Sequence, residues 1–303
     1  MPEQGGQDNA AYVRRVHDKG LQFDLRTMSR RRLLAAFGGV GALALVGGTA
    51  ACNSTNETAS PSPSTGTASA SAAAGAVTEV ESETAGPFPA DGSNGPDVRT
   101  EAGIVRQDIR SSFGGSEGTA AGVPLEFALV VTDLDGKAVT GAAVYAWHCD
   151  REGNYSLYSD GVTDQNYLRG IQATDATGTA TFTSIFPACY PGRWPHIHFE
   201  VYASTAEATG GAGPIVKTSQ LALPEEVADV VYATEGYSRS AQNLSQVSLA
   251  TDNVFGEDSA ATELAAATGS VADGYVARLT IAIDPSGEEA GGGGPGAPRP
   301  TSS

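Results

Sequence analysis

The chain is poor in basic residues. Its 303 residues include 18 lysines and arginines against 35 aspartates and glutamates, a formal net charge of −17 at pH 7. Seven of the basic residues precede residue 52, so the rest of the chain carries 11 basic and 31 acidic side chains. This balance argues against nucleic acid and against an anionic membrane surface as partners.

Long hydrophobic runs are also missing. The one sustained apolar run, from Leu33 to about Val46, is shorter than the roughly 20 residues that a membrane-spanning helix needs, and it is built from Ala and Gly as much as from Leu. It follows the arginines 30–32 and leads into small residues that end at Cys52. Residues 1–51 are therefore interpreted as a twin-arginine export signal, which places the protein outside the cell or at its surface.

Cysteine is scarce, with three in the whole chain. Cys52, after two alanines, is a candidate for lipidation, which would anchor the exported protein to a membrane. In an oxidising compartment the other two, Cys149 and Cys189, most simply form a disulfide with each other, and a metal-binding role is the competing interpretation.

Large apolar side chains are almost absent from both flanks of the chain. Residues 52–76 are rich in Ser, Thr, Ala and Pro and are expected to form a flexible tether, and residues 285–303 are expected to be a disordered Gly/Pro tail. A single domain is left between them, over residues 77–284.

Within this domain apolar residues alternate with polar ones in short runs separated by turn residues. The pattern predicts an all-β fold, a β-sandwich of mainly antiparallel strands with long loops and few short helices. The clearest strands are expected at 124–133, 143–149, 178–185 and 196–202, and short helices or helical turns are expected at 223–233 and 259–269.

Histidine is also scarce: only four are present, and one of them, His17, lies in the export signal. Two of the others, His196 and His198, stand one residue apart in "HIHFEVY". On a strand these two share a face, about 6.6 Å apart, while Ile197 and Phe199 point the other way, into the core. Two imidazoles that leave one strand in the same direction suit a metal ion.

The third and fourth ligands decide which metal is bound, and the residues leave two sets open. Glu200 lies on the same strand face and would complete a two-histidine, one-carboxylate set for iron(II). Alternatively, Tyr155 and Tyr190 would supply phenolates, which favour iron(III) because only a strong Lewis acid deprotonates a phenol at neutral pH.

Three segments together resemble the intradiol ring-cleavage dioxygenases, the family of catechol 1,2-dioxygenase and protocatechuate 3,4-dioxygenase, in an exported single-domain form. They read G-x-Y at 153–155, R-G-x-x-x-T-D-x-x-G at 169–178 and Y-P-G-R-x-P-H-I-H at 190–198, with "ETAGPFPADGSNG" upstream at 83–95. The resemblance covers about 120 residues.

The resemblance implies a non-haem Fe(III) site held by Tyr155, Tyr190, His196 and His198. Tyr190 matches the tyrosine that leaves the metal when substrate binds. Arg193 matches the arginine over the substrate ring, and Gln220 matches a glutamine near the same pocket. The implied reaction uses O2 to cleave the ring of a small-molecule catechol between its two hydroxyls, giving a cis,cis-muconate-type product. A disulfide between Cys149 and Cys189 would pin the loop that carries Tyr190.

Two other hypotheses stay open at this point. The stretch 130–156 also looks like the β-sandwich repeats of surface adhesion and carbohydrate-binding proteins, which have no catalytic site. The other is the iron(II) enzyme that would use His196, His198 and Glu200. An oligomer is possible under each hypothesis.

Overall fold

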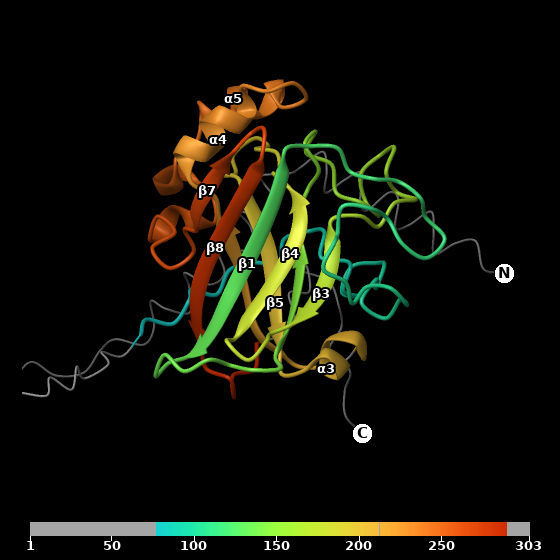
Figure 1. Ribbon diagram of the computed structural model, residues 1–303, viewed down its shortest axis with the longest axis vertical. Helices are drawn as coiled ribbons and strands as arrows, with labels where there is room; N and C mark the ends of the chain where they lie inside the picture. Colours follow the sequence, from blue (N-terminus) through green and yellow to red (C-terminus); the bar gives the residue numbers. More distant parts are fainter. Residues whose placement is uncertain (1–76, 212, 290–303) are drawn as a thin grey trace, which may run out of the picture.

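Two four-stranded sheets form the body of the protein in the computed structural model, which describes residues 77–211 and 213–289. One sheet has the order β4-β1-β8-β7, the other β3-β2-β5-β6. All neighbouring strands of the two sheets run antiparallel except β1 and β8, which are parallel. The predicted all-β sandwich of mainly antiparallel strands is confirmed (Figure 1).

The two sheets and the helices are made of the following elements. The first sheet consists of β1 (Pro124–Asp133), β4 (Thr179–Ile185), β7 (Ala266–Ser270) and β8 (Gly274–Ile283). The second consists of β2 (Ala143–Trp147), β3 (Arg169–Ala173), β5 (His196–Tyr202) and β6 (Ile215–Ala222). The helices are α3 (Thr205–Thr209), α4 (Glu225–Tyr232), α5 (Ser238–Leu244), η1 (Leu249–Thr251) and η2 (Phe255–Glu257).

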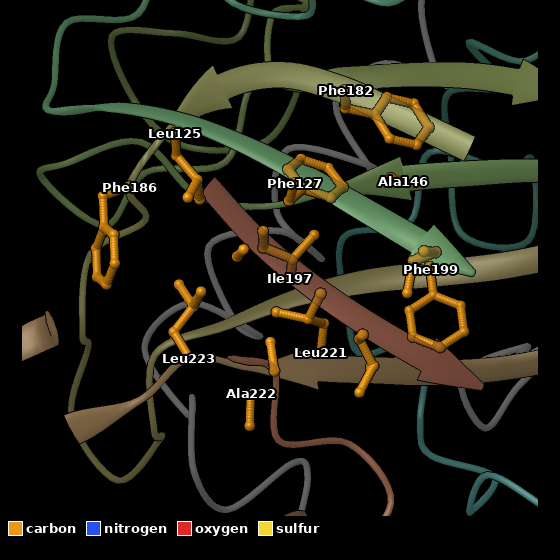
Figure 2. Close-up of a cluster of buried hydrophobic side chains, with 14 of the residues drawn as sticks. Leu125, Phe127, Ala146, Phe182, Phe186, Ile197, Phe199, Leu221, Ala222 and Leu223 are labelled. Carbon is orange, nitrogen blue, oxygen red and sulfur yellow. The ribbon is translucent and has the colours of Figure 1, made fainter. Parts of the chain in front are cut away.

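The main core lies between the two sheets. Period-two alternation turns Leu125, Phe127 and Leu129 of β1 toward this core, and Ile197 and Phe199 of β5 meet them from the other sheet. Figure 2 shows Leu125, Phe127, Ile197 and Phe199 gathered between the strands. Both faces of β5 are buried, but only one of them faces this core.

The three described α-helices lie toward the ends of the sheets (Figure 1). Helices α4 and α5 gather at one end of the sheets and α3 lies at the other (Figure 1). Loops cover the outer face of the second sheet, where a smaller cluster of buried residues includes Ala85, Trp147 and Tyr155. This loop-covered face carries the candidate site.

The predicted helix or helical turns at 259–269 are present only in part: the Leu264 N–H donates to the Ala260 carbonyl at 3.1 Å, but no helix forms. Residues 259–269 contain turns and the start of β7, which pairs antiparallel with β8. Gly269 has φ = +134°, outside the helical region, and a Cβ there would lie 2.2 Å from the carbonyl oxygen of Gly274. This close backbone approach in the hairpin overrides the helix propensity of the alanines. The other predicted helix, at 223–233, is present as α4.

The predicted export signal, the tether and Cys52 lie outside the described residues, as does the tail from residue 290. Residues 285–289, at the start of the predicted tail, are described, and Glu289 is bound to β6: its carboxylate accepts from the backbone N–H of Thr218 at 2.7 Å and lies 3.3 Å from Lys217 Nζ. In the part of the chain that the structure describes, no helix combines the length and apolar character needed to span a membrane.

Candidate metal centre and active site

Strand β5 presents His196 and His198 on the face opposite Ile197 and Phe199, toward the covering loops. In the strand register His198 lies between Trp147 of β2 and Gln220 of β6. The Trp147 ring stacks on the His198 imidazole, with centroids 5.1 Å apart and planes 4° from parallel. Strand pairing therefore fixes the direction of this imidazole from both sides.

Four side chains meet at this face through their donor atoms. The Tyr155 and Tyr190 hydroxyl oxygens are 3.4 Å apart, Tyr190 Oη lies 3.0 Å from His196 Nε2, and the Nε2 atoms of His196 and His198 are 3.2 Å apart. The structure thus brings together all four residues that the resemblance implies as metal ligands.

Burial keeps the two imidazoles neutral. The pKa of each histidine lies well below its usual range, first because burial disfavours the charged ring and then because the Arg193 cation is close. His196 Nδ1 lies 2.5 Å from the Trp194 carbonyl oxygen. Since a carbonyl only accepts, Nδ1 carries the proton and His196 Nε2 presents a lone pair to the centre of the site.

Tyr155 is held by a tight loop between β2 and β3. The Asp150 carboxylate accepts from the backbone N–H groups of Glu152 and Asn154, and the Tyr155 N–H donates to Ser159 Oγ at 2.9 Å. Burial is the main cause that raises the pKa of the Tyr155 phenol, followed by the neighbouring Tyr190. Burial outweighs the opposing effect of the nearby Arg193 cation, so this phenol stays protonated unless a metal ion binds its oxygen.

Tyr190 and Arg193 come from the turn that leads into β5, with Gly192 at φ = +77°. Tyr190 is partly exposed, whereas Tyr155, His196 and His198 are buried. Arg193 is 2% exposed, and its Nη1 lies 3.4 Å from His196 Nε2. A cation therefore stands beside the donor atoms, and solvent reaches the set at Tyr190.

The segment 83–95 crosses the site from the N-terminal side. Gln220 is fully buried; its Nε2 donates to the Thr84 carbonyl at 2.8 Å, and its Oε1 accepts from Arg193 Nη2 at 2.6 Å. Gly86 has φ = +68°, and a Cβ there would lie 3.2 Å from His198 Cε1. The Phe88 ring lies 4.9 Å from that of Tyr155. Gln220 thus joins this segment to the arginine.

The donor set fits a small, hard cation. Ligands at about 2.0–2.1 Å from one ion, at tetrahedral or octahedral angles, are themselves roughly 3 Å apart, which matches the 3.0–3.4 Å between neighbouring donors here. Two neutral imidazoles and two phenols that can ionise suit iron(III) better than softer metals.

Comparison with known proteins agrees with this geometry. Residues 94–209, which include both tyrosines, Arg193 and both histidines, match the family model described as "Dioxygenase". Chlorocatechol 1,2-dioxygenase of Rhodococcus opacus is 38% identical over 66 residues, which are 22% of this chain and 26% of that protein. Hydroxyquinol 1,2-dioxygenase of Corynebacterium glutamicum is 30% identical over 142 residues, 41% of this chain and 42% of that protein.

Among solved structures, an intradiol ring-cleavage dioxygenase from Tetranychus urticae has the same fold. Its TM-score is 0.57 at 24% identity, with 70% of this chain and 98% of that chain covered. The chain thus has the fold of an intradiol ring-cleavage dioxygenase, and its residues 94–209 match the dioxygenase family model. The matches to the two curated relatives of this family span only 26% and 42% of their length.

The iron(II) set is not formed. Among the described residues no group of three or more His, Cys, Asp or Glu side chains could hold a metal. Glu200 shares the strand face with the histidines, but its Oε2 accepts from the Tyr202 hydroxyl at 2.6 Å, farther along the strand. Alternate strand residues are separated by about 6.6 Å, which puts Glu200 about 13 Å from His196 along β5.

The predicted disulfide is also absent, because Cys149 and Cys189 are both free thiols. Cys149 Sγ faces the Ala188 carbonyl at 3.7 Å, whereas Cys189 Sγ donates to the Arg193 carbonyl at 3.3 Å. The two belong to different buried clusters. The loop of Tyr190 is instead held by two hydrogen bonds of Cys189. Its thiol donates to the Arg193 carbonyl, and its carbonyl accepts from Asn243 Nδ2 at 2.8 Å.

Two residues that support the site were not predicted from the sequence. Asp252 accepts from Arg193 Nε at 3.0 Å. The two residues are 59 positions apart in the sequence, so only the folded structure reveals this contact. Arg169 is fully buried and donates to Ser156 and to the Pro89 carbonyl, which ties the Tyr155 loop to the crossing segment. Its position at the start of the R-G-x-x-x-T-D motif is the sequence signal for this role.

Proposed function

We propose that this protein is a non-haem iron(III) dioxygenase that cleaves the aromatic ring of a catechol between its two hydroxyls. Both atoms of O2 enter the product, a cis,cis-muconate-type dicarboxylate. The observation that carries the proposal is the meeting of two phenol oxygens and two imidazole nitrogens at 3.0–3.4 Å. The named activities of the relatives support it.

Tyr155, Tyr190, His196 and His198 would hold the metal. Bound ferric iron would supply the Lewis acidity that lets both catechol hydroxyls ionise at neutral pH. The neutral histidines add no charge, so two ionised phenols and one further anion would balance the ion. A catechol dianion carries two negative charges, so it could take the place of the Tyr190 phenolate and the further anion without changing the net charge.

Tyr190 is the ligand best placed to exchange with the substrate. It is the partly exposed member of the set, and its hydroxyl lies between Tyr155 and His196. A phenolate released there would accept a proton from an incoming catechol at its Oη. Tyr155, packed against Phe88 and fully inside the loop, would stay in place.

Arg193 would stabilise negative charge that develops on the substrate. Its guanidinium is buried, held by Asp252 and Gln220, and aimed past His196 toward the donor set. A cation fixed in advance in a dry site is worth more than one that must reorganise during the reaction. Gln220 would act through this arginine and through the Thr84 carbonyl.

The experiment begins with the colour of the iron-loaded protein. Phenolate bound to ferric iron should give a red-brown charge-transfer absorption, and a panel of catechols should yield the ultraviolet-absorbing intradiol product. Tyr155→Phe should shift or abolish the visible band and lower kcat by about 10²-fold or more. A colourless protein with a full complement of iron, or extradiol products, would contradict the proposal.

Tyr158→Phe is the matched control. Tyr158 is a buried tyrosine three residues farther along the same loop, and its hydroxyl donates to Asn94 Oδ1 at 2.7 Å, outside the donor set. The control variant should keep the visible band and lose at most stability. A band that changes equally in both variants would point to the loop and not to a phenolate ligand.

The location of the activity is a further part of the proposal. A twin-arginine signal would export the protein after folding, with iron already inserted, and lipidation at Cys52 would keep it at the cell surface. Fractionation of the producing cells tests this. Recovery of the chain with residues 1–51 intact in the cytoplasm would contradict export.

A further inference from the structure

Asp252 lies between η1 and η2 and is one of the most completely enclosed carboxylates of the described chain, with its side chain 0% exposed. Its Oδ2 accepts from Arg193 Nε at 3.0 Å and from the Trp194 backbone N–H at 2.6 Å. Its Oδ1 accepts from the backbone N–H groups of Val254 and Phe255 at 2.7 and 2.8 Å. The carboxylate thus joins the turn before β5 to the start of η2.

All four groups that face Asp252 are donors. A carboxylate has two acceptor oxygens and can satisfy donors on both sides, whereas an asparagine amide must point its NH2 group at donors on one side. The pair of opposite charges is also buried, where a missing partner costs far more than an exposed one. The site therefore requires an anion of this shape and not only a polar side chain.

The Arg193 guanidinium is oriented by these contacts. Nε is bound by Asp252, and Nη2 donates to Gln220 Oε1, so the fixed planar fork directs Nη1 to within 3.4 Å of His196 Nε2. Phe255, placed by the same carboxylate through its N–H, lies under the guanidinium with 5.7 Å from Cζ to the ring centroid. One carboxylate therefore sets both the cation and the ring beneath it.

We propose that Asp252 is a positioning residue that holds the Arg193 guanidinium in the orientation needed to stabilise charge on the bound substrate. The inference rests on the proposed function. Asp252 lies beyond the segment 94–209 that matches the family model, in a part of the chain that follows α5. It acts on the reaction only through Arg193.

The test is a double-mutant cycle on the iron-loaded full chain. Asp252→Asn, Arg193→Gln and the double variant are compared with the unmodified protein for kcat and KM on catechol. Asp252→Asn alone should lower kcat by about 10- to 100-fold with KM changed less than about threefold, because a misdirected cation is lost mainly from the transition state. In the Arg193→Gln background the same change should cost less than about twofold.

Asp252→Ser guards against a folding defect. Serine can still cap the backbone N–H groups of η2 but is too short to reach Arg193, so it separates the two functions of the carboxylate. Asp258→Asn is the control, since Asp258 is an exposed carboxylate of the same segment that caps Ala260 and Ala261. It should leave kcat unchanged.

Spectra keep the inference separate from the proposed function. All Asp252 variants should retain the visible band of the iron-loaded protein and its shift on anaerobic addition of 4-nitrocatechol, because no ligand has been altered. If the unmodified protein cleaves no catechol, the proposed function fails. If it is active and Asp252→Asn and Asp252→Ser stay within twofold of it, the role of Asp252 is refuted.

Equal losses of kcat on Asp252→Asn in the unmodified and the Arg193→Gln backgrounds would also refute the positioning role, because Asp252 would then act on the fold and not through Arg193.

Hydrogen exchange tests the role without any variant. In the ¹⁵N-arginine-labelled protein the Arg193 Nε–H should be protected from exchange with solvent. Exchange at the rate of a free guanidinium would overturn the inference.

Discussion

The two faces of the β3-β2-β5-β6 sheet differ in chemistry although they share the same strands. On the inner face Val144, Ile197 and Phe199 pack against the other sheet. On the outer face His196, His198 and Gln220 are equally buried, but loops cover them and each finds a polar partner. Burial alone therefore does not separate core from site. The covering element does, because loops bring backbone acceptors and charged side chains that a second sheet does not.

The largest effect is expected from the outer face of β5. His198→Gln removes one of the four donors and should lower kcat by about 10³-fold or more, with loss of iron and of the visible band. Iron content and absorbance measure this directly.

His148→Gln is the comparison for that change. His148 is also fully enclosed, but its ring nitrogens are bonded to Ser184 Oγ and to the Cys149 carbonyl, and burial lowers its pKa to about 4. The variant should lose stability and keep iron. If His198→Gln retained full iron and colour, the division between the two faces would fail.

A change on the inner face of the same strand should act on stability. Phe199→Ala leaves a cavity among the core side chains of Figure 2 and should lower the free energy of unfolding by about 3–5 kcal/mol. The fraction that remains folded should still bind iron with an unchanged band. Urea unfolding with absorbance of the folded fraction checks both statements, and a variant that keeps its stability but loses its colour would reverse the assignment of the faces.

The smallest effect is expected from a buried carboxyl outside the donor set. Burial, and then the nearby Asp258, raises the pKa of Glu263 from 4.5 to about 7. The folded protein therefore binds a proton more tightly than the unfolded chain, and stability falls as the pH rises from about 4.5 to about 7. Allowing for partial solvent screening, the loss is about 1–2 kcal/mol.

Glu263→Gln should remove this part of the pH dependence. Unfolding free energies of the two proteins, measured by urea titration at pH 4.5, 6 and 8, should converge at the acid end, with the variant the more stable at pH 8. Parallel curves would show that the carboxyl is ionised at no cost. Activity should be unaffected, since Glu263 bonds to Thr262 and lies away from the four donors.

The sequence predicts best where one periodic signal decides the structure. Strands β1 and β5 have the predicted bounds because alternation with a core on one side leaves one register. Strand β7 was missed because its alanines favour a helix locally, and only pairing with β8 and the positive φ of Gly269 make it a strand.

The residues of the site also separate into those that the sequence predicts and those that it does not. Its four donors and Arg193 stand in motifs with fixed spacing, so the resemblance could assign them. Asp252 could not be found, since its link to Arg193 spans 59 residues and depends on how the segment after α5 returns to the sheet. Nor could the cysteine pair be judged, because two cysteines in one sequence say nothing of which carbonyl each thiol faces.

The crossing segment 83–95 is bound to both sheets by the residues at and just before its start. Backbone N–H groups of Val80 and Glu83 donate to Ala282 and Thr218 at 2.9 Å, and Lys217 Nζ lies 2.7 Å from Glu79. A pull along the chain from its N-terminal side would meet these bonds, in shear against two strands, before it reached Thr84. Mechanical tension is thereby decoupled from the arginine and its glutamine, so the chain could be tethered at that end without disturbing the centre.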